Sequence, residues 1–314
     1  MNLIICQTPL QVLIAEKIIE KYPKEIFYGL LLDGIKNDKY QYYYQRLKRR
    51  CTKCDYICTK KPYIKWEFYK LVFKRIANLH KFTNIDKIFL ANTDTELVHL
   101  YIGDIYKTNI ITFDDGLANI NFKDTPFLKD RLRSRTKLLR NFIDIPTTKD
   151  ILAHQIKHYS LYNLPNIMGK YEKLNLFDEI RVSECEKTED IHILLGQPIF
   201  ESLQNAEKSN VEIIQKVLSR YHIDFYYPHP RETYKIREIL YINTPLIFED
   251  WLIQQVQQHP NKKYVIYTFF SSVVLNLGNL PNLEIIALKP QDCPKRFLFL
   301  YNFFEKYNIS IRNI

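Results

Sequence analysis

A histidine held between two prolines is the residue of this chain best suited to chemistry. It is His229, in the stretch YYPHPRE, and Pro228 and Pro230 restrict the backbone on both sides of it because a proline ring fixes φ. Arg231 follows with a positive charge that suits a phosphate. The stretch closes an apolar run. It is therefore either a stiff loop with an incidental histidine or a strand end that presents a catalytic or phosphate-binding imidazole.

Two polar pairs also follow apolar runs. Asp114 and Asp115 precede Gly116 in FDDG, where paired acids suit a general base or a ligand for polar substrate groups, although Asp-Gly also favours a simple turn. Ser271 and Ser272, in TFFSS, stand where a strand passes into a helix, and a helix start favours an anion. The histidine, the arginine, the two hydroxyls and the helix start all suit a phosphate-bearing leaving group. Together they predict a nucleotide site.

The alternation of apolar runs with helical patterns predicts where these loops lie. The expected strands and their following loops are residues 2–6, 27–34, 86–92, 109–116, 191–198, 223–230, 262–272 and 283–290. Continuous apolar strands between helices are typical of a parallel sheet covered on both faces. The sequence therefore predicts an α/β fold with two such domains, 1–155 and 189–314, and a mostly helical connection reaching about residue 188. Ligands of such sheets bind outside the carboxyl ends of the strands, where all these motifs fall.

Several common sites are absent from the sequence. It has 7 glycines, with no GxGxxG, no GxxxxGK[ST], no GxSxG and no DxD pair. Three of the 6 cysteines lie together in CTKCDYIC without a fourth ligand nearby, which favours reduced thiols over a metal site. Residues 151–162 read as a helix that carries His154 and His158 on one face. The glutamate of an HExxH zinc motif is Gln155 here, so we expect an ordinary surface helix.

The net charge of +10 is concentrated in one tyrosine-rich block. Residues 36–81 contain 14 Lys and Arg against 3 acids. Such a block suits nucleic acid, an anionic membrane surface or an acidic glycolipid, and equally a solvated helical face. The first residues lack the basic region of a signal peptide, and no apolar stretch approaches the roughly 20 residues of a membrane span. We therefore expect a cytoplasmic protein.

The motifs as a set resemble a known family. FDDG, ILLGQP, YPHPRE, YTFFSS and ALKP occur in this order and at similar spacing in bacterial lipooligosaccharide sialyltransferases, glycosyltransferase family 52. CQTPLQVLIAEKII and DKYQYYYQRLK also resemble that family, so the similarity covers nearly the whole chain. It implies a GT-B fold, with two Rossmann-like domains that face each other across a cleft. It also implies an inverting, metal-independent transfer from CMP-N-acetylneuraminic acid (CMP-Neu5Ac) to a terminal galactose of lipooligosaccharide, with α-2,3 as the expected linkage.

The resemblance assigns roles to residues of this chain. His229 matches the catalytic acid of the family's HP motif, which would protonate or hydrogen-bond the departing CMP phosphate. The residues expected to bind the donor are Gly196, Pro230, Arg231, Glu249 as a ribose ligand, and Ser271 and Ser272 as phosphate contacts. Family members can be homodimers. For this chain the resemblance implies peripheral contact with the inner membrane rather than an anchor, and no nucleic acid as a partner.

The sequence leaves two candidates for the catalytic base. Related enzymes carry an aspartate soon after the LLGxP loop, whereas Ile199 follows Pro198 here and the nearest carboxylate is Glu201. Asp115 is the rival, because the acidic pair before glycine supplies the base in other sialyltransferase families. We place Glu201 first and keep Asp115.

Two other functions stay open at this point. One is a glycosyltransferase of the same fold with another nucleotide sugar, which a comparison of CMP, UDP and GDP binding would distinguish. The other is a basic nucleic-acid-binding protein, which predicts binding that weakens steeply with salt. The second does not account for the HPRE and FFSS loops.

Overall fold

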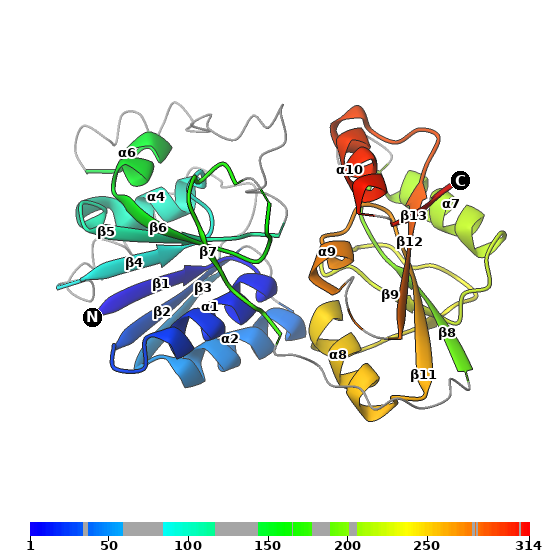
Figure 1. Cartoon of the computed structure of the whole chain (residues 1–314), viewed down its shortest axis with the longest axis horizontal. Helices are drawn as coiled ribbons and strands as arrows, with labels where there is room; N and C mark the ends of the chain where they lie inside the picture. The colour runs from blue at the N-terminus through cyan, green and yellow to red at the C-terminus, as the bar shows by residue number, and fades with distance from the viewer. Residues whose placement is uncertain are drawn as a thin grey trace. The chain divides into compact units, whose positions relative to one another are not determined.

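The protein divides into two compact units in the computed structural model. Unit 1 is Met1–Leu176 and unit 2 is Phe177–Ile314. The structure describes residues 1–33, 37–58, 84–116, 144–164, 166–177, 189–200, 206–277, 280, 282–307 and 309–314. Each unit is built around its own parallel sheet (Figure 1). The predicted α/β class with two parallel-sheet domains is therefore confirmed.

The sheet of unit 1 is entirely parallel, in the order β3-β2-β1-β4-β5-β6-β7 among the described residues. Its strands are β1 (Asn2–Cys6), β2 (Phe27–Asp33), β3 (Lys53–Cys58), β4 (Lys87–Leu90), β5 (Asn109–Phe113), β6 (Gln155–Ser160) and β7 (Glu172–Lys173). The strand order reverses between β1 and β4. In open α/β sheets that point is where ligands bind, outside the carboxyl ends of the strands.

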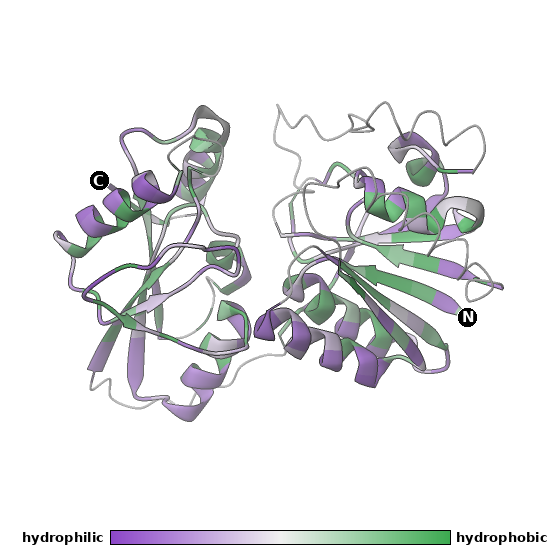
Figure 2. Ribbon diagram, turned by 180° about the vertical axis from the view of Figure 1, so that it is seen from behind, coloured by the Kyte–Doolittle hydropathy of each residue, from purple (hydrophilic) through white to green (hydrophobic). Residues whose placement is uncertain are grey.

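Helices cover both faces of this sheet (Figure 1). They are α1 (Pro9–Lys21), α2 (Asp38–Arg50), α4 (Glu96–Ile102) with the 3-10 turn η2 (Gly103–Ile105), and α6 (Thr148–Ala153). The Thr8 hydroxyl caps α1 by accepting from Gln11 N–H, and Pro9 occupies the first helical position, as its fixed φ favours. Figure 2 shows largely hydrophobic strands between helices of mixed colour, the pattern of a sheet buried on both faces.

The segment 151–162 is not the helix that the sequence predicts. The helix α6 stops at Ala153, and Gln155–Ser160 forms β6, paired in parallel with β5. His154 ends the helix and His158 lies fully buried on the strand, so the two imidazoles do not share a helix face. The apolar positions in this stretch match both periods over a short length, and pairing with β5 decides between them. With β6 and β7, the first sheet continues as far along the chain as Lys173.

The sheet of unit 2 is also parallel, in the order β10-β9-β8-β11-β12-β13 within the described part. Its strands are β8 (Glu189–Leu195), β9 (Phe225–Tyr227), β10 (Leu240–Tyr241), β11 (Lys262–Thr268), β12 (Leu283–Lys289) and β13 (Ser310–Asn313). Its helices are α7 (Ala206–Leu218), α8 (Phe248–Gln258), α9 (Val273–Leu277) and α10 (Lys295–Lys306). The strand order reverses between β8 and β11, the second expected ligand position.

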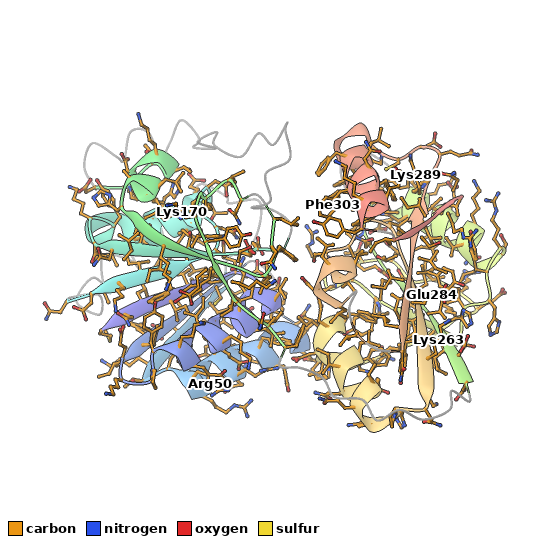
Figure 3. The ribbon with its side chains drawn as sticks, viewed as in Figure 1. Arg50, Lys170, Lys263, Glu284, Lys289 and Phe303 are labelled. Carbon is orange, nitrogen blue, oxygen red and sulfur yellow. The ribbon has the colours of Figure 1, made fainter. Side chains whose placement is uncertain are left out.

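Alternate residues of the unit 2 strands pack on opposite faces. Leu194 and Val265 join the core under α7, whereas Ile193 and Ile266 join the core under α8 and α9. At the rim of this sheet the exposed pair Lys263 and Glu284 joins β11 to β12, with Nζ 2.6 Å from Oε2 (Figure 3). The polar edges of the strands therefore face water, and the apolar centres hold the sheet together.

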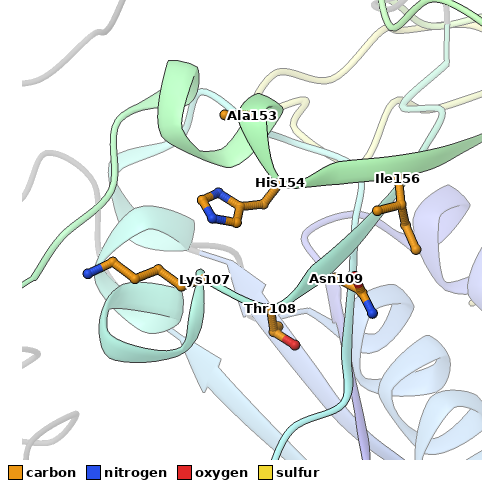
Figure 4. Close-up of a pocket in the computed structure, with 6 residues that line it drawn as sticks. All are labelled: Lys107, Thr108, Asn109, Ala153, His154 and Ile156. Atoms are coloured by element: carbon orange, nitrogen blue, oxygen red, sulfur yellow. The ribbon is translucent and has the colours of Figure 1, made fainter.

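A surface hollow of about 460 Å³ lies at the amino end of the unit 1 sheet (Figure 4). It is lined by Lys107, Thr108, Asn109, Ala153, His154 and Ile156. The residue that opens β5 forms part of this lining, so the hollow lies at the edge opposite the strand-end loops. Because open α/β sheets bind ligands at the carboxyl edge, we do not place the active site here.

Candidate functional site

The loops that follow β8 and β11 are tied together by one side chain, Gln197. Its Oε1 accepts hydrogen bonds from the Phe269 N–H (2.9 Å), the Phe270 N–H (3.0 Å) and the Thr268 hydroxyl (3.2 Å). The strands that carry these loops are neighbours at the reversal point of the sheet. A single amide oxygen thus orients the start of the loop that leads to Ser271. Gln197 is not among the site residues expected from the sequence, although it lies in the LLGQP motif.

The loop after β9 holds His229 in a defined orientation. The Arg231 N–H donates to His229 Nδ1 over 3.1 Å, and the Glu232 N–H donates to the His229 carbonyl over 3.0 Å. A backbone N–H is always a donor, so Nδ1 must be the acceptor, and the proton of the neutral imidazole is on Nε2. His229 is half-buried, and Pro228 and Pro230 flank it. The turn therefore presents an Nε2–H donor, which suits a phosphate oxygen.

A buried carboxyl lies behind this turn. Glu232 Oε2 accepts from the Tyr226 hydroxyl (2.7 Å) and from the His229 N–H (3.3 Å). Burial raises the pKa of Glu232 to about 7, and the two hydrogen bonds oppose part of that rise. A Cβ at Gly196 would lie 2.5 Å from Glu232 Oε2 and 2.5 Å from the Tyr226 hydroxyl oxygen. Gly196 is thus required by close packing at the end of β8.

The hydroxyl pair opens a short helix, as predicted. Ser271 Oγ accepts from the Val273 N–H over 3.3 Å, and the Ser272 carbonyl accepts from the Asn276 N–H over 3.0 Å. The helix α9 has only 5 residues, so its dipole contributes little, and anion binding here depends on the hydroxyls and the loop N–H groups. Glu249 is buried in the first turn of α8 and accepts from the Asn276 side chain over 3.0 Å. Asn276 therefore links the expected ribose ligand to the serine loop.

The acidic pair of unit 1 divides into two different environments. Asp114 is fully buried and accepts from the Ser160 hydroxyl (2.7 Å) and the Leu161 N–H (2.7 Å), with His158 Nε2 at 3.1 Å. It is engaged by the neighbouring strand β6 and serves the fold. Asp115 is partly exposed at the end of β5. Asp115 is thus the less buried of the two residues.

The surroundings of Asp115 are rich in side-chain amides. Burial raises the pKa of its carboxyl, the Gln11 and Asn92 amides oppose the rise, and the charge of Asp114 adds to it. The Asn92 amide donates to Gln7 Oε1 over 2.8 Å, which connects the loops after β1 and β4 at the reversal point. Carboxylate and amide groups at such a position suit a ligand with several hydroxyls.

The other residues predicted for the site lie in the histidine turn or outside the described residues. Pro230 and Arg231 lie in the histidine turn, while Glu201 lies outside the described residues. Ile199, which stands where related enzymes have an aspartate, is fully buried in the core of unit 2. In the described part of the chain, no group of three His, Cys, Asp or Glu side chains is placed to share a metal ion.

The basic block is described only in part. Within α2, Tyr40, Tyr43 and Leu47 face the core, while Arg50 projects outward, 3.0 Å from Glu20 (Figure 3). Over the described residues, this is the pattern of a solvated helical face with an apolar side toward the sheet. No helix in the described ranges is both long and apolar enough to cross a bilayer.

Two parallel-sheet units with polar loops at the carboxyl ends of the strands define an α/β protein of the GT-B type. Two solved structures share this architecture. The glycotransferase of kitacinnamycin has a TM-score of 0.53 at 8% identity, covering 100% of this chain and 86% of its own. A UDP-N-acetylglucosamine 2-epimerase has a TM-score of 0.50 at 12% identity, covering 100% and 84%. At these identities the likeness concerns the fold alone.

The chain belongs to glycosyltransferase family 52, whose model matches residues 24–292. It is 34% identical to the N-acetyllactosaminide alpha-2,3-sialyltransferase of Haemophilus influenzae, covering 99% of both chains. It is also 34% identical to the CMP-N-acetylneuraminate:beta-galactoside alpha-2,3-sialyltransferase of Pasteurella multocida, covering 100% of this chain and 99% of the relative. An N-acetyllactosaminide alpha-2,3-sialyltransferase of Neisseria meningitidis is 29% identical over 99% of this chain and 85% of its own. The family expected from the motifs is confirmed, and with it a glycosyltransferase.

Proposed function

We propose that this protein is an inverting, metal-independent sialyltransferase that moves N-acetylneuraminic acid from CMP-Neu5Ac to O3 of a terminal galactose on lipooligosaccharide. The observation that carries the proposal is identity along the whole chain with named α-2,3-sialyltransferases of two organisms, 34% in each case. The loops after β9 and β11 support it, because one carries an Nε2–H donor at His229 and the other carries the hydroxyls of Ser271 and Ser272.

In this reaction the bond between C2 of the sialic acid and the phosphate oxygen breaks, and CMP leaves with the electron pair. The galactose O3 forms the new bond to C2 and gives its proton to a carboxylate base. His229 Nε2–H meets the phosphate oxygen on which charge develops, and the hydrogen bond strengthens as the bond to C2 lengthens. The serine hydroxyls hold the other phosphate oxygens, and Glu249 takes the ribose hydroxyls.

Glu201 and Asp115 are the two proposed bases. Glu201 follows the LLGQP loop of unit 2. Asp115 has a raised carboxyl pKa, which brings it closer to the working pH of a general base. We expect Glu201→Gln to lower transfer far more than Asp115→Asn. The opposite ranking would assign the base to unit 1.

The proposed activity also implies a cellular location and an oligomeric state for the protein. We propose a cytoplasmic enzyme that meets its anionic glycolipid acceptor at the inner membrane, with the basic block facing that surface, and that forms homodimers. Vesicles with and without anionic lipid, together with the mass in solution by light scattering, test these two points. Vesicle binding that is independent of anionic lipid would contradict the role of the basic block.

The activity is tested by incubating the protein with CMP-Neu5Ac and a galactose-terminated acceptor, with the product linkage read by NMR. We expect an α-2,3 product, unchanged turnover after treatment with EDTA, and loss of most CMP release in His229→Ala. In a calorimetric comparison of CMP, UDP and GDP we expect CMP to bind best. Tighter binding of UDP would indicate that the donor is another nucleotide sugar and not CMP-Neu5Ac. Near wild-type turnover of His229→Ala would contradict the role of the histidine.

A further inference from the structure

The carboxyl of Glu232 joins three parts of unit 2 that surround the histidine turn. Its Oε2 accepts from the Tyr226 hydroxyl of β9 and from the His229 N–H. Its Oε1 is buried and makes no hydrogen bond to any residue that the structure describes. Gly196, at the end of β8, packs so closely that even a Cβ there would overlap Oε2. The carboxyl thus lies at the meeting point of β8, β9 and the turn.

This arrangement connects the imidazole to a rigid anchor. Tyr226 is fully buried in the core of unit 2, and its ring packs against Tyr241 with centroids 5.2 Å apart. From that anchor, Glu232 Oε2 holds the His229 N–H, and the Glu232 N–H returns to the His229 carbonyl. The backbone of His229 is therefore held on both sides by one residue. The turn closed in this way brings the Arg231 N–H onto Nδ1.

We propose that Glu232 is a positioning residue for His229, which holds the turn so that the neutral imidazole carries its proton on Nε2. The proposal rests on the proposed function for the role of that proton, namely a hydrogen bond to the leaving phosphate. The part of the proposal that concerns the turn and the tautomer of His229 does not depend on the substrate. A positioning residue of this kind acts on the reaction step more than on binding, because a misplacement of about 1 Å at the reacting atoms costs about 10²-fold in rate.

The first test is the tautomer of His229, read from the two ring ¹⁵N shifts by long-range ¹H–¹⁵N NMR and assigned with His229→Gln. We expect the Nε2–H tautomer in the wild-type protein and in Glu232→Gln, whose amide oxygen still accepts from Tyr226 and His229. Glu232→Met keeps the buried volume and removes the acceptor, so we expect a mixture of tautomers. Glu212→Ala, at an exposed glutamate of α7, is the matched control and should match the wild type.

Two results would overturn the proposal without any activity measurement. One is an Nδ1–H tautomer in the wild-type protein, which needs no variant to fold. The other is an unchanged Nε2–H tautomer in Glu232→Met. The first would show that His229 does not adopt the proposed tautomer, and the second that the Glu232 carboxyl does not determine the tautomer.

The second test is kinetic, with CMP-Neu5Ac and a galactoside. We expect kcat of Glu232→Met to fall about 10²-fold, with a much smaller change in KM for the donor, and Glu232→Gln to stay near the wild type. A lower melting temperature with unchanged kcat would reduce Glu232 to a structural tie and refute the positioning role. If the wild-type protein transfers no sialic acid, the proposed function fails, while the tautomer measurement still decides the role of Glu232.

Discussion

Replacing Gln197 with alanine tests whether one amide oxygen holds the serine loop of unit 2. The variant leaves two backbone donors, the Phe269 and Phe270 N–H groups, without their acceptor, whereas the Thr268 hydroxyl can rotate toward another. Phe269 is fully buried and Phe270 is partly exposed, so water can reach only the second donor. An unsatisfied buried N–H costs about 1–3 kcal/mol. We therefore expect a loss of about 3 kcal/mol in the free energy of unfolding of unit 2.

Urea denaturation followed by a probe in unit 2 measures this loss, and a thermal scan should show a drop of roughly 10 °C. The matched control is Gln257→Ala, an exposed glutamine of α8, which should change stability by less than about 0.5 kcal/mol. If both variants lose the same small amount of stability, the three hydrogen bonds of Gln197 do not stabilise unit 2.

The charged variant Gln197→Glu separates stability from binding. A carboxylate accepts the same N–H groups, so we expect most of the stability to remain. It also introduces a negative charge beside the loop of Ser271, so the Kd for CMP should rise about 10-fold, equivalent to about 1.4 kcal/mol. CMP binding equal to that of the wild type would show that this loop does not receive the phosphate.

Three further predictions concern the buried groups. Gly196→Ala should lower the free energy of unfolding by about 1–3 kcal/mol in urea denaturation, because the new Cβ would lie 2.5 Å from Glu232 Oε2 and from the Tyr226 hydroxyl oxygen. No loss would mean that the Glu232 and Tyr226 side chains move aside freely. Asp114→Ala should cost about 3 kcal/mol or more and speed hydrogen exchange of unit 1 strands, because the surrounding buried donors, His158 among them, lose their acceptor. Burial raises the pKa of Glu232 from 4.5 to about 7, so the folded chain binds this proton more tightly than the unfolded chain does. The free energy of unfolding should then fall by at most about 3 kcal/mol as pH rises from about 4.5 to 7, and it should fall less in Glu232→Gln. Equal slopes of stability against pH in both proteins would show that Glu232 is not the group with the raised pKa.

Local pattern was sufficient for much of the architecture. Continuous apolar runs predicted the strands that carry the motifs, since a strand buried on both faces needs apolar residues at every position. The start of α1 also depends on adjacent residues, because the Thr8 hydroxyl caps it and Pro9 has the fixed φ of a first helical position. The position of His229 at a strand end followed from the same reasoning, together with the prolines around it.

The error at residues 151–162 shows where that reasoning ends. A run of six residues satisfies helical and strand periods about equally well, and only pairing with β5, more than forty residues earlier in the chain, makes it β6. The same pairing brings His158 and Ser160 onto Asp114. Which aspartate of the DDG motif serves the fold was thus decided by a distant strand, because adjacent carboxylates look equivalent in sequence.

The sequence by itself determined the family, the strands that carry the motifs, and the histidine that the prolines hold. The tertiary structure decided what surrounds that histidine. Glu232 became a buried carboxyl with a raised pKa, and Gln197 an acceptor for three donors of another loop, only when β8, β9 and β11 came together. Hydrogen bonding and burial depend on neighbours in space, and a polar residue in a loop carries no local signature of the partners it will meet.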